Sequence, residues 1–230
     1  IRPVTDDRPY FFENRKWAQA LRHPLNLLAT SQYNNWSGTF MALSFLLSLG
    51  VVLLLIIFGY RALAPRPPFM TLAAAICYFG SIGLGYMLVQ ITLIQKGALT
   101  LGHPIYAMTV IIPTLLVSMG VASAVVSTPL FRRTGVRWMG MAFPALAILC
   151  VDRFFSARTG LDSSHLSVRV VLTVLALCPL GCCLGVCFPL GLQVFGKNAR
   201  EVIPLAWTIN GGASVLGSLC ALGISLIFGF

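Results

Sequence analysis

Residues 78–95 decide the fold class of this chain. They read Tyr78-Phe79-Gly80-Ser81-Ile82-Gly83-Leu84-Gly85-Tyr86-Met87-Leu88-Val89-Gln90-Ile91-Thr92-Leu93-Ile94-Gln95. The stretch carries no charge until Lys96, so it can lie in hydrocarbon as a helix. Its glycines let neighbouring helices approach closely, and its buried glutamines can hydrogen-bond across to them. The stretch therefore predicts a transmembrane helix of a polytopic membrane protein.

The composition of the whole chain agrees with that interpretation. Of the 230 residues, 57% are hydrophobic and 10% are charged, and the mean hydropathy is +0.87, whereas soluble domains have about 25% charged residues. The net charge is +10, which in a membrane protein reflects Lys and Arg at helix ends near anionic headgroups. No basic run is interleaved with exposed aromatic residues, as a nucleic-acid groove requires. We therefore expect the lipid bilayer as a partner and no nucleic acid.

The apolar runs predict an all-α fold, a polytopic helical bundle of about six transmembrane helices that occupies residues 38–230. The expected spans are Thr39–Tyr60, Phe69–Gln95, Pro104–Leu130, Trp138–Val151, Val168–Phe195 and Val202–Phe230. The fourth span is shorter than the roughly 20 residues that a bilayer requires, so it needs local thinning of the bilayer. Basic residues divide almost evenly between the two sides, so the positive-inside rule leaves the orientation open.

Residues 1–37 differ in kind from the rest and predict an extramembrane segment. Trp17 and Leu21 share one helical face while Arg15 and Arg22 point elsewhere, which is typical of a short helix lying in the membrane interface. The segment is alternatively the tail of a soluble domain. The chain begins at Ile1 and its last residues are apolar, so we expect the native polypeptide to extend beyond both ends.

Three side chains of the 78–95 stretch, those of Tyr86, Gln90 and Gln95, are candidates for polar contacts inside the bundle. Gly83, Tyr86 and Gln90 lie one and two turns apart on one face, and Gln95 follows near the helix end. A glutamine in hydrocarbon costs free energy unless it is paired. These side chains either hydrogen-bond to a neighbouring helix or line a polar cavity between helices.

Two further polar candidates lie outside that stretch. His103 stands between Gly102 and Pro104, at the membrane surface, where it either caps the next helix and faces headgroups or binds haem and relays protons. Asn210 begins the polar stripe Asn210/Ser214/Ser218, which can hydrogen-bond to another helix. The parallel small-residue stripe of the sixth span, at 213, 217 and 221, suits tight packing.

The fifth span contains Gly181 and Gly185, a GxxxG pair that permits close helix contact, together with Pro179 and Pro189. It is either a kinked packing helix or a broken helix that offers backbone polar groups to a substrate. The seven cysteines lack the spacing of a zinc or haem motif, and we interpret them as packing residues. No catalytic, cofactor-binding or metal-ligating constellation is recognisable.

Five stretches in order resemble the carboxy-terminal membrane part of bacterial spermidine-synthase-like integral membrane proteins, over nearly the whole chain. They are Thr5–Phe12, Gly83–Gln95, Leu101–Ala107, Phe188–Leu192 and Trp207–Ser218. The resemblance implies a bacterial inner-membrane location and a soluble domain similar to an aminopropyltransferase or methyltransferase. That domain's nucleoside-binding motifs are absent here, so any transferase activity would lie outside this chain. Where family members often have glutamate, this chain has Gln90, a departure that bears on any proton-linked role.

Three hypotheses about function follow. The first is a non-catalytic membrane module that anchors or scaffolds a soluble enzyme domain, fused or associated, or other membrane subunits. The second is a small-molecule transporter or channel unit whose cavity is lined by Tyr86, Gln90 and Asn210. The third, an electron-transfer subunit with His103 as a haem ligand, ranks last.

Overall fold

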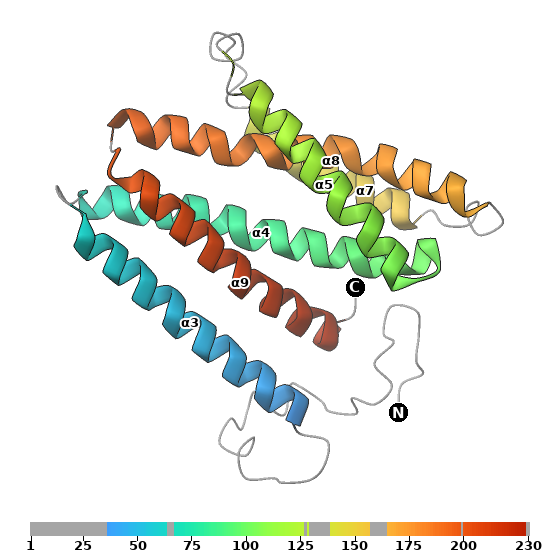
Figure 1. Cartoon of the computed structure of the whole chain (residues 1–230), viewed down its shortest axis with the longest axis horizontal. Coiled ribbons are helices and arrows are strands. Elements are labelled where there is room, and N and C mark those ends of the chain that lie inside the picture. The colour runs from blue at the N-terminus through green and yellow to red at the C-terminus, as the bar shows by residue number, and fades with distance from the viewer. Residues whose placement is uncertain are drawn as a thin grey trace.

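The computed structural model describes residues 36–63, 67–126, 128, 139–156, 165–198 and 200–228, and in these ranges every regular element is an α-helix (Figure 1). The helices are α3 (Trp36–Ala62), α4 (Phe69–Leu101), α5 (Pro104–Val126), α7 (Met139–Ser156), α8 (Leu166–Asn198) and α9 (Val202–Phe228). The predicted all-α helical membrane bundle is confirmed. The predicted interfacial segment at residues 1–37 lies almost wholly outside the described residues.

Five of the described helices are long and apolar enough to cross a membrane: α3, α4, α5, α8 and α9. The chain is therefore an integral membrane protein by the character of its helices. The described part of α7, the predicted fourth span, is not among the five. This helix has 18 residues and carries Asp152 and Arg153 near its carboxyl end, which accords with the expectation that it is short for a bilayer.

Two helices extend by about five residues or more past the carboxyl ends that the sequence predicts, and the others differ less. α4 continues beyond Gln95 through Lys96 to Leu101, and α7 continues beyond Val151 through Asp152 to Ser156. The same interaction explains both extensions, because Lys96 Nζ and Asp152 Oδ1 form an ion pair at 2.5 Å. Each charge has a partner in the neighbouring helix, so neither has to end its own helix. α4 ends at Gly102, whose φ of +81° gives the left-handed cap that glycine favours.

Two parallel helix pairs build the bundle. α4 packs most extensively against α9, and α5 packs most extensively against α8. Within each pair the two helices run in the same direction (Figure 1). α3 packs against α9, and α7 packs mainly against α8. The α4 segment around Lys96 and the end of α7 that carries Asp152 lie at one end of the molecule, which we call the Lys96 end.

Glycines allow these pairs to approach at backbone distance, as the small-residue stripes predict. An ideal Cβ on Gly185 of α8 would lie 2.6 Å from the Met119 Cα atom of α5, and one on Gly217 of α9 would lie 2.9 Å from the Leu84 Cα atom of α4. Real Cβ atoms do not come so close, so only glycine fits. The predicted GxxxG contact of the fifth span is confirmed.

The buried core is divided into two clusters along α4. One lies toward the Lys96 end and includes Leu93, Ile111 and Leu180, from three different helices. The other lies toward the amino end of α4 and includes Phe79 and Leu205. Between these clusters, seven residues of α4 between Ser81 and Val89 line a cavity.

Candidate functional site

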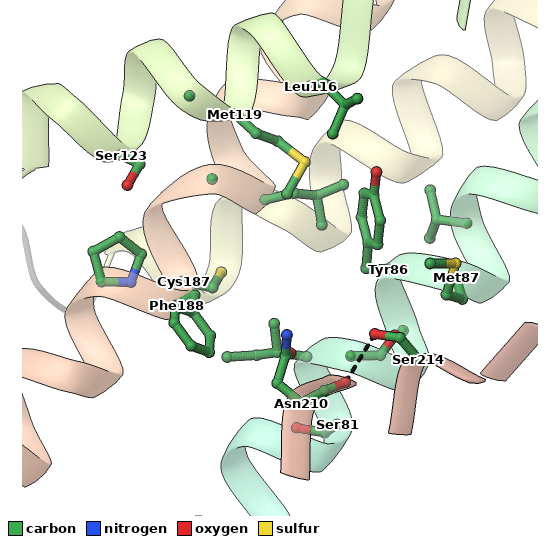
Figure 2. Close-up of a pocket in the computed structure, with 18 of the residues that line it drawn as sticks. Ser81, Tyr86, Met87, Leu116, Met119, Ser123, Cys187, Phe188, Asn210 and Ser214 are labelled. Carbon is green, nitrogen blue, oxygen red and sulfur yellow. Dashed lines mark hydrogen bonds between the residues drawn. The ribbon is translucent and has the colours of Figure 1, made fainter. Parts of the chain in front are cut away.

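The cavity between the two core clusters has a volume of about 500 Å³ and is lined by residues of α4, α5, α8 and α9, with one residue of α7. Figure 2 shows Tyr86 of α4, Met119 of α5, Phe188 of α8 and Asn210 of α9 around the same space. Its size falls in the range of small-molecule sites, which is about 300–1,000 Å³. Its lining is mainly apolar, with a few polar groups: Ser81, Tyr86, Ser123, Cys187, Asn210 and Ser214.

The cavity lies near the middle of the membrane spans. Tyr86 is central in α4, which runs from residue 69 to residue 101, and Leu116 is central in α5, which runs from 104 to 126. A ligand here would therefore be surrounded by protein at the depth of the hydrocarbon core. At that depth an unpaired polar group costs free energy, so polar groups in the lining indicate a functional site.

Missing side chains create much of the space. Gly85 of α4 and Gly120 of α5 line the cavity, and a Cβ atom built on either would meet nothing within 4 Å. Two other lining glycines behave differently, because Gly83 contacts the Asn210 backbone and Gly185 contacts the Met119 backbone. The first pair leaves room for a ligand, and the second pair brings the four helices together around that room.

Polar groups of α9 and α4 meet at one wall of the cavity. The Ser214 hydroxyl donates to the Asn210 carbonyl at 2.8 Å and to the Gly83 carbonyl at 3.3 Å, linking the two helices. The Asn210 side-chain Oδ1 is buried and finds no hydrogen-bond donor among the described residues. Leaving a buried acceptor unpaired costs about 1–3 kcal/mol. A rotation of the carboxamide about its Cβ–Cγ bond would let a bound donor in the cavity relieve that cost.

The cavity opens sideways between α5 and α9. Leu116 of α5 and Trp207 of α9 both line it, and yet they remain 56% and 60% exposed. Over the described residues, α5 packs against α8 and α4, and α9 packs against α4 and α3, so the two helices form facing walls. Because α5 and α9 are long and apolar enough to span a membrane, we expect this opening to face lipid.

The structure separates the five sequence-predicted residues. It brings Tyr86 and Asn210 together at the cavity. Gln90 is only 9% exposed and is not among the residues that line this space. Gln95 makes an interhelix contact, in which its Nε2 donates to Ser225 Oγ of α9 at 3.3 Å. Tyr86 and Gln90 share one helical face, but Tyr86 lines the cavity and Gln90 is buried outside it.

His103 lies apart from the cavity, in the connection between α4 and α5. Its Nδ1 accepts the Ile105 backbone N–H at 3.2 Å, which is a capping arrangement for the first turn of α5. Its ring makes an edge contact with Tyr106, with centroids 5.9 Å apart. Within the described residues, no three His, Cys, Asp or Glu side chains group in a way that could hold a metal ion.

Sequence reasoning missed a polar cluster at the Lys96 end. Besides the Lys96–Asp152 pair, the Arg169 Nη1 atom of α8 donates to the Thr100 carbonyl of α4 at 2.9 Å. The signal was present, because Lys96, Asp152 and Arg169 each lie just inside or just outside a predicted span end. Spacing along the chain did not show that the three ends meet.

Comparisons with protein-family models, with curated proteins and with solved structures find no match to this chain.

Proposed function

We propose that this bundle is a membrane transport module that binds an amphiphilic small molecule in the cavity between α4, α5, α8 and α9. The observation that carries the proposal is the cavity's combination of depth, lining and opening. It lies at mid-membrane depth, its lining includes polar groups of α4 and α9, and it opens toward lipid between Leu116 and Trp207. A lipid-soluble molecule can enter such a site directly from the bilayer.

The lining indicates the class of ligand. Most of the wall is apolar, including Met119 and Phe188, so the bulk of the ligand is hydrocarbon or aromatic. The polar groups, above all Tyr86 and Asn210, are neutral hydrogen-bonding groups. They match a hydroxyl, carbonyl or amide on the ligand and would leave a full charge without a counter-charge.

A second candidate function is favoured by α3, namely an anchor or scaffold in a larger bacterial inner-membrane assembly. α3 packs against α9 and exposes large apolar side chains such as Leu47 and Phe58 along its length. This face suits lipid or a helix of another membrane subunit. In line with the resemblance to spermidine-synthase-like membrane proteins, the partner would be a soluble transferase-like domain, fused or associated. The two functions are compatible, because they use different faces.

The test is to fill the cavity without disturbing the packing. Gly85→Phe places a ring in the open space beside Tyr86, where a new Cβ atom meets nothing within 4 Å. Gly50→Phe is the matched control, since Gly50 also has open space around it and lies near the middle of α3, away from the cavity. Both variants and the parent are purified in mild detergent, and native mass spectrometry records the small molecules that co-purify.

We expect the parent and Gly50→Phe to carry the same bound amphiphile, and Gly85→Phe to lose it while keeping its melting temperature. Equal occupancy in all three proteins would contradict the cavity as the binding site. A protein that carries no amphiphile at all, and takes none up from added lipid extract, would leave the scaffold function as the better proposal.

A further inference from the structure

A second cavity adjoins the first on the side of the Lys96 end. It has a volume of about 220 Å³ and lies between α4, α7 and α8, with Thr92 and Leu180 in its walls. Its polar lining includes both members of the Lys96–Asp152 pair. The Lys96 side chain is 20% exposed and that of Asp152 is 47% exposed, so this part of the cavity reaches the surface of the protein.

The two cavities share a wall. Val89 of α4 and Ile148 of α7 line both of them. On α4, the lining positions Ser81, Gly85, Val89, Thr92 and Lys96 follow one another at three or four residues along a single helix face. That face extends over about 22 Å, because an α-helix rises about 1.5 Å per residue. One continuous face of α4 therefore runs from the mid-membrane cavity to the charged pair.

α7 supplies the opposite wall of the outer part. Ile148 and, one turn further along this short helix, Val151 and Asp152 all line the second cavity. α7 rests mainly on α8 and touches α4 over a short contact, across which Lys96 and Asp152 pair. Because the contact between α4 and α7 is small, the distance between Val89 and Ile148 depends on few contacts between these two helices.

We propose that the two cavities form one pathway, with Val89 and Ile148 as its constriction and the Lys96–Asp152 pair as its mouth at the aqueous boundary. This inference rests on the proposed function, and it gives the main cavity a second entrance besides the lateral opening between α5 and α9. A site with one entrance from lipid and one from water passes an amphiphile between the bilayer and the aqueous boundary. The ligand's polar end leads toward Lys96, and its apolar end toward the lateral opening.

A native cysteine provides the test. Cys187 lines the main cavity beyond the constriction. The other six cysteines are replaced by alanine: Cys77, Cys150, Cys178, Cys182, Cys183 and Cys220. The protein is placed in phosphatidylcholine nanodiscs, where lipid covers the lateral opening. A charged, membrane-impermeant methanethiosulfonate then reaches Cys187 only from the water, and mass spectrometry follows the labelling rate.

Ile148→Trp is the variant that closes the constriction, and Leu149→Trp is its control. Leu149 is the next residue of α7, is 62% exposed and lines neither cavity. We expect Ile148→Trp to abolish most labelling of Cys187, Leu149→Trp to label at the parent rate, and Ile148→Ala to label faster. Equal rates in the parent, Ile148→Trp and Ile148→Ala would overturn the proposal. So would loss of labelling in Leu116→Trp, at the lateral opening, combined with the parent rate in Ile148→Trp.

Changing the charge of the Lys96–Asp152 pair tests whether this pair forms the mouth of the pathway. Asp152→Asn leaves Lys96 without its counter-charge, so the local potential becomes positive and favours anions. We expect the ratio of anionic to cationic reagent labelling at Cys187 to rise in Asp152→Asn and to stay unchanged in Arg153→Gln, the exposed neighbour. An unchanged ratio in Asp152→Asn would show that the reagent does not pass the pair. Labelling requires no bound ligand, so failure of the pathway and failure of ligand binding are distinguished.

Discussion

Two glycines of α4 stand two residues apart and have opposite surroundings. A Cβ atom on Gly83 would collide with the Asn210 carbonyl of α9, whereas one on Gly85 would meet nothing within 4 Å. The same contrast recurs where α5 meets α8, between Gly185 against the Met119 backbone and Gly120 beside open space. One residue type thus serves two purposes in this bundle. Some glycines let helices touch, and others leave the cavity empty.

The difference follows from the rotation of each helix about its own axis. Successive residues of a helix are turned by about 100°, so positions 83 and 85 face directions more than a right angle apart. Gly83 faces α9, which packs most extensively on α4, and Gly85 faces the space between the two helix pairs. Close packing on one side and a cavity on the other are therefore built from the same short run of α4.

The largest effect is expected from Gly185→Ala. Its new Cβ atom would lie 2.6 Å from the Met119 Cα atom and 2.9 Å from the Met119 carbonyl carbon, and backbone atoms cannot rotate away as a side chain can. The α5–α8 pair must separate, and we expect the free energy of unfolding to fall by about 3 kcal/mol. Reversible unfolding in mixed detergent and dodecyl sulfate micelles measures it. Gly120→Ala is the control, and equal midpoints for the two variants would remove the distinction between the two classes of glycine.

A smaller effect is expected from breaking the Lys96–Asp152 ion pair, which lines the second cavity. Asp152→Asn weakens the contact of α7 with α4, and because both side chains are partly exposed we expect a loss of about 1 kcal/mol. The loss should shrink in high salt, which screens exposed pairs. A double-mutant cycle with Lys96→Met isolates the pair, and Arg153→Gln controls for charge on the same helix. Additive single effects would mean that the pair does not hold α7 in place.

A still smaller effect is expected from the polar contact that joins α4 and α9 near the Lys96 end. Gln95→Leu removes the hydrogen bond from Nε2 to Ser225 Oγ, and interhelical hydrogen bonds in membranes are worth about 0.6 kcal/mol. Ser218→Ala is the control, since that hydroxyl donates to the Val215 carbonyl of its own helix. A loss as large as that of Gly185→Ala would mean that polar contacts, and not backbone proximity, hold the packed region together.

The sequence predicted the helices better than the site. Uncharged apolar runs bounded by Pro104, Gly102 and basic residues define spans by themselves, because hydrocarbon tolerates few charges. The two helices that extend furthest past their predicted ends do so through Lys96 and Asp152, each of which has a partner in another helix. Sequence alone does not show such a partner.

The site was only half predictable for a related reason. Tyr86 and Gln90 are one turn apart and share a face in an isolated helix, but Tyr86 lines the cavity while Gln90 is buried outside it. Where a cavity begins and ends is fixed by the crossing of α4 with three other helices. Asn210 was predicted as the first member of the polar stripe Asn210/Ser214/Ser218, and the structure places it with Tyr86 among the residues that line the same space.

The last and smallest expected effect has the opposite sign. Gly85→Ala adds a methyl group where nothing lies within 4 Å, so it creates no clash, and it removes the flexibility that glycine gives to a helix interior. We expect the free energy of unfolding to rise by about 0.5 kcal/mol, measured beside Gly83→Ala, which should lower it because its methyl group meets the Asn210 carbonyl. If Gly85→Ala instead destabilises the protein as Gly83→Ala does, the cavity wall at Gly85 is packed in the membrane, and the space beside Tyr86 is not available to a ligand.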